Sequence, residues 1–120
     1  MSSARLGALG EELAVRFLRD GGYRILATNY RCNYGEVDIV AKDGRVLAFI
    51  EVRTRRSRRF GAAEESLTAA KRKHLVAACQ DYIQRHGDGD VEWRIDLVCV
   101  YFGQAENVDG ITHIRQAIQL

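Results

Sequence analysis

The chain has 120 residues, 47% of them hydrophobic and 28% charged, which suits one compact domain spanning residues 1–120 with a single core. Its net charge of +2 is too small to indicate a nucleic-acid partner, and three scattered cysteines without a C-x-x-C pair indicate neither a disulfide framework nor a zinc site. No apolar run is long enough to cross a bilayer and no signal-peptide pattern begins the chain, so we expect a cytoplasmic protein without membrane contact.

The first expected element is an amphipathic helix over residues 4–20. Ser2 or Ser3 can cap its start, and the pair Gly21-Gly22 ends it. Apolar side chains recur along it at helical spacing, at Leu6, Leu9, Leu13 and Phe17. The apolar stretch over residues 23–30 then predicts a first strand.

Two strands over residues 36–42 and 45–53 follow, joined by Asp43-Gly44, a dipeptide preferred in two-residue hairpin turns. In that register Lys42 faces Arg45. Alternation then gives one face that is apolar at every position, and this face is expected to lie against the core. Its members are Val37, Ile39, Ala41, Val46, Ala48, Ile50 and Val52.

The opposite face of this hairpin gathers acids at the end away from the turn. Glu36 is expected opposite Glu51, with Asp38 diagonal to Glu51 at a Cβ separation of about 7 Å or less. Opposed like charges destabilise a sheet, so this arrangement needs compensation. A divalent cation such as Mg²⁺ would supply it, and so would an ion-pair cluster with Arg53 and Arg31. The pattern leaves both interpretations open.

A dense arginine block comes directly after the second hairpin strand, at Arg53, Arg55, Arg56, Arg58 and Arg59. Such a block beside a phosphodiester would supply the salt-sensitive attraction typical of nucleic-acid binding. A solvated arginine-rich loop is the alternative interpretation, and charge alone does not separate the two.

The remaining elements are a second helix, from Ser66 or Thr68 to His86 and closed by Gly87, and strands over residues 91–101 and 111–118. The predicted order is αβββαββ, an α/β (α+β) protein with a mixed sheet and flanking helices. Within the first of these strands Asp96 is expected to have a structural role, paired with Arg94 or a neighbouring strand. The three histidines, His74, His86 and His113, have no metal-ligand spacing, and we assign them no site role.

Several segments together resemble the YraN-like family of bacterial proteins of uncertain function. They are Gly35-Glu36-Val37-Asp38-Ile39-Val40, Phe49-Ile50-Glu51-Val52-Arg53, Gly10-Glu11, Gly22-Tyr23, Asn29-Tyr30-Arg31, Lys71 and Arg94-Ile95-Asp96-Leu97-Val98. That family is similar to a compact branch of the restriction-endonuclease-like, PD-(D/E)XK superfamily, whose relatives include archaeal Holliday-junction resolvases. The resemblance implies a restriction-endonuclease-like mixed sheet flanked by helices.

The superfamily pattern is an acid on one strand and E-x-K on the next. By resemblance, Asp38 matches the first acid, Glu51 the second, and Glu11 on the first helix a further acid, so these three are the implied ligands of Mg²⁺ or Mn²⁺. Arg53 stands where the pattern has lysine. Because arginine is not deprotonated in proteins, Arg53 suits charge stabilisation rather than general-base catalysis, and a metal-bound water would be the nucleophile.

The resemblance therefore implies a Mg²⁺-dependent endonuclease acting on nucleic acid, with DNA as the expected polymer and branched DNA as one substrate. In this hypothesis Glu36 helps to position the metal, and a homodimer is plausible by analogy with the resolvases. The expected nucleic-acid contacts are Arg55, Arg56, Arg58, Arg59, Lys71 and Lys73. The alternatives are a catalytically inactive nucleic-acid-binding module and a protein-interaction scaffold of the same fold.

Overall fold

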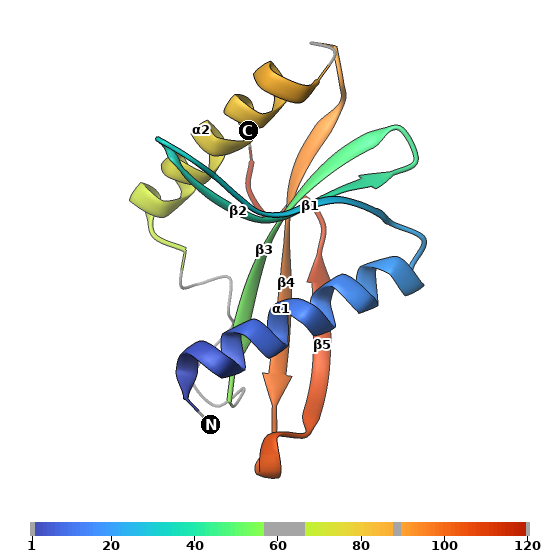
Figure 1. Ribbon diagram of the computed structural model, residues 1–120, viewed down its shortest axis with the longest axis vertical. Coiled ribbons are helices and arrows are strands. Elements are labelled where there is room, and N and C mark those ends of the chain that lie inside the picture. Colours follow the sequence, from blue (N-terminus) through green and yellow to red (C-terminus); the bar gives the residue numbers. More distant parts are fainter. Residues whose placement is uncertain (1, 57–66, 88–89, 120) are drawn as a thin grey trace.

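The computed structural model describes residues 2–56, 67–87 and 90–119 (Figure 1). In these ranges the chain forms two α-helices, five strands and one short 3₁₀ turn. In chain order they are α1 (Ser3–Asp20), β1 (Arg24–Cys32), β2 (Gly35–Asp43), β3 (Val46–Arg55), α2 (Ala69–His86), β4 (Trp93–Phe102), η3 (Gln104–Glu106) and β5 (Val108–Ile114).

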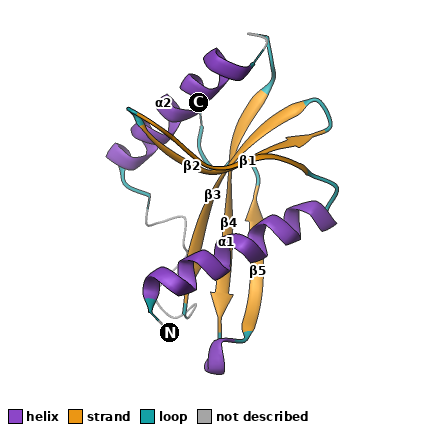
Figure 2. Cartoon of the chain, in the orientation of Figure 1, coloured by secondary structure: helices purple, strands orange, loops and turns teal. Residues whose placement is uncertain are grey.

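The strands form one mixed sheet in the order β1-β2-β3-β4-β5. Strands β3 and β4 are parallel, and each of the other neighbouring pairs is antiparallel. The two helices cover opposite faces of this sheet, because α1 and α2 contribute to separate hydrophobic clusters (Figure 2). The predicted fold class and the order αβββαββ are confirmed.

The helix ends agree with the capping residues that the sequence offers. The hydroxyl of Ser2 accepts the backbone N–H of Arg5 at 3.2 Å, and α1 ends at Gly21. The hydroxyl of Thr68 accepts the backbone N–H of Lys71 at 3.2 Å, so Thr68 is the cap of α2, and Ser66, the other predicted cap, lies outside the described residues. Side-chain caps satisfy amide groups that the first helical turn leaves without a partner.

The last strand lies earlier in the chain than the sequence predicts, at Val108–Ile114 instead of residues 111–118. It ends because Gln116 adopts a left-handed backbone conformation, with φ 51°, and donates its N–H to the carboxylate of Asp96 at 3.0 Å. The buried carboxylate of Asp96 therefore accepts the backbone N–H of Gln116, which would otherwise be available to continue the strand pairing.

The β2–β3 register differs from the expected one. Asp43 pairs with Val46, so the turn consists of Gly44 and Arg45, and the predicted pairing of Lys42 with Arg45 is wrong. Gly44 has φ 61°, which suits a turn with glycine at its first central position. The shift moves cross-strand partners by two positions, so side chains keep their faces while the pairs across the strands change.

Both faces of the hairpin are buried. The predicted apolar face packs under α1 at Ile39, Ala41, Ala48 and Ile50. The opposite face is also buried, under α2, at Val40, Leu47 and Phe49. Val37 belongs to this α2 cluster, contrary to the prediction, because the β1–β2 hairpin bends across toward α2 (Figure 1).

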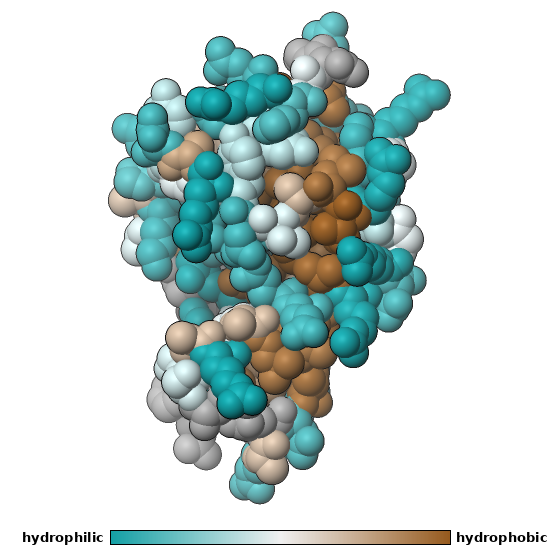
Figure 3. Space-filling view, in the orientation of Figure 1, coloured by the Kyte–Doolittle hydropathy of each residue, from teal (hydrophilic) through white to brown (hydrophobic). Residues whose placement is uncertain are grey.

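The outer surface is polar over α2, whereas hydrophobic side chains remain visible in a band between the two helices (Figure 3). Within the described residues, neither helix combines the length and the hydropathy that a bilayer crossing requires.

Helix α1 lies close against β3 at Gly10. A Cβ atom on Gly10 would lie 2.3 Å from Oγ1 of Thr54 and within 3.4 Å of two other side-chain atoms of Thr54, so Thr54 or the helix must shift to admit it. We expect Gly10→Ala to lower the free energy of unfolding by roughly 1–3 kcal/mol through overpacking, measured by urea denaturation.

The matched control is Gly7→Ala on the same helix, where an added Cβ meets nothing within 4 Å. Because alanine has a greater helix propensity than glycine, Gly7→Ala should raise the free energy of unfolding by up to about 1 kcal/mol. Equal effects of the two substitutions would contradict the close approach of α1 to β3.

Candidate functional site

The two acids singled out by the sequence meet where β2 separates from β3. The paired ladder ends at Ile39 and Ile50, and continuing its register by one residue sets Asp38 directly across from Glu51. Beyond this point the carboxylate of Asp38 accepts the backbone N–H of Val52 at 2.8 Å. A side chain thus replaces a main-chain partner, and the strands part around two carboxyl groups that contact each other.

The point where β2 separates from β3 beside Asp38 and Glu51, which we call the strand fork, is electrostatically unfavourable for two negative charges. Burial, followed by the charge of Asp38 and contact between the two carboxyl groups, raises the pKa of Glu51 to about 7, although Arg53 opposes this shift. Burial also raises the pKa of Asp38, against the effect of the hydrogen bond from Val52. The pair therefore tends to retain a proton in conditions where ordinary carboxyl groups have lost theirs.

The arginines near these acids compensate only in part. Arg53 lies 3.7 Å from the Glu51 carboxylate, and each of these side chains is 18% exposed. The Nε atom of Arg53 is buried without a hydrogen-bond partner among the described residues. Arg31 and Glu36 form a second pair at 3.5 Å, exposed enough to contribute little stability. Asp38 itself makes no ion pair within the described residues.

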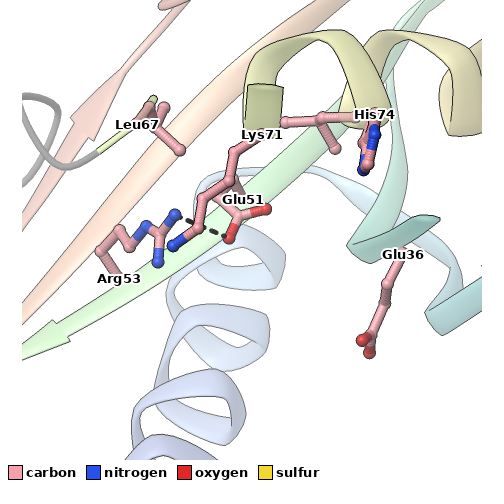
Figure 4. A pocket seen from close by; sticks show the side chains of 7 residues that line it. Glu36, Glu51, Arg53, Leu67, Lys71 and His74 are labelled. Carbon is pink, nitrogen blue, oxygen red and sulfur yellow. Dashed lines mark ion pairs between the residues drawn. The ribbon is translucent and has the colours of Figure 1, made fainter. Parts of the chain in front are cut away.

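Glu51 opens into a pocket of about 250 Å³ between the strands and α2 (Figure 4). Acidic and basic groups share its walls: Lys71 extends from α2 toward Glu51 and Arg53 on β3, and His74 lines the pocket one helical turn further along α2. The lining residues are Glu36, Glu51, Arg53, Leu67, Lys71, His74 and Leu75. Carboxylates that can hold a cation therefore face cationic groups that can bind an anion.

The third predicted acid, Glu11, is on α1 and lines a different hollow, beside Thr28 and Asn29. Burial and the charge of Asp38 raise its pKa, and a hydrogen bond with Asn29 opposes that shift. Glu11 is thus within electrostatic reach of the fork. Within the described ranges, however, no three His, Cys, Asp or Glu residues are grouped closely enough to hold a metal ion. The structure brings together a two-carboxylate site, and ligation by Glu11 stays a prediction.

The predicted nucleic-acid contacts divide among several surfaces. Lys71 lies in the Glu51 pocket, whereas Lys73 lines a separate groove between α2 and the C-terminal segment. Arg55 donates to the carbonyl of Thr54 at 3.0 Å, and Arg56 is exposed. Arg58 and Arg59 lie outside the described residues.

Two residues at the site were not selected from the sequence. His74 enters the pocket because it follows Lys71 by one helical turn, a spacing that could have identified it once Lys71 was chosen. Asn29 contacts Glu11 from a strand position with φ 53°. Asparagine is enriched in such left-handed conformations, so its place inside a predicted strand was the available signal.

Asp96 has the structural role expected of it. Its fully buried carboxylate accepts from Nε of Arg94 at 2.9 Å, contacts Nε2 of His113 at 2.8 Å and accepts the N–H of Gln116. Burial alone would raise the pKa of Asp96, but these contacts outweigh burial and lower it. This cluster joins β4, β5 and the segment that follows, and it is separate from the Glu51 pocket.

Fold and site together define a small α+β protein with a five-stranded mixed sheet and a pair of carboxyl groups beside a pocket where β2 separates from β3. The chain belongs to the uncharacterised protein family UPF0102, whose family model matches residues 10–100. This agrees with the YraN-like resemblance, while membership of the wider nuclease superfamily stays a prediction.

Similar proteins match along nearly the whole chain. A UPF0102 protein of Caldicellulosiruptor saccharolyticus is 43% identical over 117 residues, which cover 98% of this chain and 99% of the relative. A UPF0102 protein of Roseiflexus castenholzii is 44% identical over 116 residues, covering 96% and 94%. One of Moorella thermoacetica is 43% identical over 117 residues, covering 98% of both chains.

Proposed function

We propose that this protein is a cytoplasmic, metal-dependent endonuclease that binds nucleic acid and hydrolyses phosphodiester bonds, with branched DNA among its substrates. The observation that carries the proposal is the contact between the carboxyl groups of Asp38 and Glu51, half-buried where β2 separates from β3, with Glu51 open to a pocket that has cationic side chains. Folding alone does not favour such a pair, because each negative charge raises the cost of the other.

The donor set fits a hard divalent cation. Mg²⁺ binds through one or two carboxylates and keeps several waters, so Asp38 and Glu51 suffice to hold it and a third protein ligand is not required. When bound, Mg²⁺ or Mn²⁺ would supply a water of lowered pKa as nucleophile and would polarise a phosphate oxygen. Zinc is less suited, because no cysteine or histidine completes a tetrahedral set with these acids in the described residues.

The other pocket residues have distinct roles in this proposal. Arg53 stabilises the negative charge that develops on the phosphate, a role for a permanently charged guanidinium group. Lys71 holds a phosphate oxygen from the opposite wall, and Glu36 orients water at the metal. Arg55 and Arg56, at the end of β3, extend the positive surface along the nucleic-acid backbone.

The test is cleavage of end-labelled linear duplex, flap and four-way-junction DNA by purified protein with Mg²⁺, with Mn²⁺ or with EDTA. We expect metal-dependent cleavage that Asp38→Asn reduces by about 100-fold or more. Asp43→Asn is the matched control, since it makes the same change on β2 at the other end of the strand. If the wild-type protein cuts none of these DNA substrates, or if Asp38→Asn cuts them equally well, the catalytic proposal fails.

Arginine in place of the pattern's lysine at position 53 favours one second candidate, a binding module without catalysis. It predicts DNA affinity in EDTA that falls steeply with added salt and does not depend on metal. Fluorescence anisotropy over a salt series tests this candidate. Absence of binding at low salt would leave the protein-interaction scaffold.

A further inference from the structure

Two basic side chains on α2 line the candidate pocket and have no partner in the part of the chain that the structure describes. Lys71 and His74 are one helical turn apart and both line the pocket; Figure 4 shows Lys71 reaching toward Glu51, while the His74 ring stays close to α2. Among the described residues, neither side chain makes a hydrogen bond or an ion pair. Lys71 already has a place in the proposed function as a phosphate contact, whereas His74 has none.

Packing of the helix fixes the position of His74. A Cβ atom on Gly35 would lie 3.3 Å from the carbonyl oxygen of His74, so the β1–β2 turn rests directly on the backbone of α2 at this residue. The backbone of His74 is therefore held against the start of β2, while its side chain is exposed to solvent.

The geometry of phosphodiester hydrolysis implies different roles for the strand side and the α2 side of the pocket. In an in-line displacement, the attacking and leaving oxygens lie on opposite sides of the phosphorus atom. Of the carboxylates that would hold the metal and its water, Glu51 lines the strand wall of the pocket and Asp38 contacts Glu51 from β2. The leaving oxygen then points toward α2, where Lys71 and His74 lie.

The leaving oxygen must gain a proton, and few groups can supply it. The carboxylates are committed to the metal in the proposed function, and the guanidinium of Arg53 does not release a proton. A histidine, in contrast, exchanges a proton readily near neutral pH. We propose, on the basis of the function proposed above, that His74 is the general acid that protonates the leaving oxygen.

The step balances as follows. The attacking water oxygen forms a bond to phosphorus and its proton passes to solvent, while the bond from phosphorus to the leaving oxygen breaks and that oxygen keeps the electron pair. The imidazolium of His74 gives its proton to this oxygen, yielding an alcohol and a phosphate monoester. The neutral imidazole then takes a proton from solvent.

A substrate with sulfur in place of the leaving oxygen tests the proposal, because a thiolate leaves without protonation. We expect His74→Asn to slow cleavage of the ordinary phosphodiester by about 100-fold and to leave cleavage of the sulfur-bridged substrate within about threefold of wild type. His86→Asn is the matched control: it is the same change on the same helix, at a residue that lines other hollows beside Tyr30 and Tyr82. It should alter neither rate.

A second readout needs neither metal nor turnover. In EDTA, titration with a short single-stranded oligonucleotide should shift the imidazole proton resonances of His74 and leave those of His86 unchanged. Three results would overturn the role of His74 without contradicting the proposed nuclease function. His74→Asn could slow cleavage of both substrates equally, it could slow cleavage of neither, or the imidazole resonances of His74 could stay unmoved by the oligonucleotide. If wild-type protein cuts neither substrate, the proposed function fails and the role of His74 fails with it.

Discussion

Replacing Asp96 by asparagine should lower the free energy of unfolding by roughly 3–5 kcal/mol. The carboxylate is fully buried and satisfies Arg94, His113 and the backbone of Gln116 at once. Asparagine has nearly the same shape but no charge, and its amide group adds a donor where three donors already converge. The guanidinium of Arg94, only 14% exposed, would lose its best partner, which is costly inside a protein.

Asp43→Asn is the matched control for this prediction. Asp43 accepts from the same guanidinium at 3.1 Å, but its side chain is 36% exposed, so the loss should stay within about 1 kcal/mol. Urea denaturation with an unchanged m-value measures both variants. If Asp96→Asn is no more destabilising than Asp43→Asn, the buried cluster does not hold β4 and β5 together as inferred.

Local chemistry explains why the helices were predictable. The hydroxyls of Ser2 and Thr68 cap their helices through neighbours three residues away, and Gly21 and Gly87 end them. Such contacts involve only residues that are close in the sequence, so they can be predicted without knowledge of the tertiary structure. The end of β5 is different, because it depends on a contact between Gln116 and Asp96, which lie 20 residues apart.

The hairpin register shows where local rules become insufficient. Asp43-Gly44 is a strong turn signal, yet Asp43 also reaches Arg94 on β4 and stays at the end of β2. The turn therefore moves by one residue, to Gly44 and Arg45. The alternation of faces survived this shift between Ile39 and Ile50, but it fails at Val37, and Asp38 instead of Glu36 lies across from Glu51.

The candidate site was predictable in the part that belongs to the strands. Asp38 and Glu51 lie on neighbouring segments whose alternation brings them together in either register. On the opposite wall only Lys71 was selected from the sequence, since the rest of that wall depends on how α2 docks across the sheet. His74 gives no signal in isolation, and Lys73 resembles Lys71 in sequence although the two face different hollows.

Glu51→Gln should stabilise the metal-free protein above neutral pH. Burial and the charge of Asp38 raise the pKa of Glu51 to about 7, whereas an unfolded glutamate has a pKa of about 4.3. Between these values the folded protein holds a proton that the unfolded chain has released, so this group makes stability fall as pH rises through the interval. Above this pH interval the ionised Glu51 destabilises the folded protein by roughly 3 kcal/mol, and glutamine removes this destabilisation.

Urea denaturation in EDTA should therefore show similar stability for wild type and Glu51→Gln at about pH 5, and a clear advantage for the variant at about pH 8. Glu12→Gln, an exposed position on α1, is the control without an expected effect. A variant that is less stable than wild type at the higher pH would contradict the unfavourable charge pair.

Added Mg²⁺ connects this stability difference with the proposed function. A divalent cation that binds the folded carboxylate pair stabilises it by mass action, so Mg²⁺ should raise the stability of wild type at about pH 8 and close its gap to Glu51→Gln. The variant lacks one of the two ligands and should respond little. Equal stabilisation of both proteins by Mg²⁺ would place the ion elsewhere, and the strand fork would then be a strained acid pair without a metal.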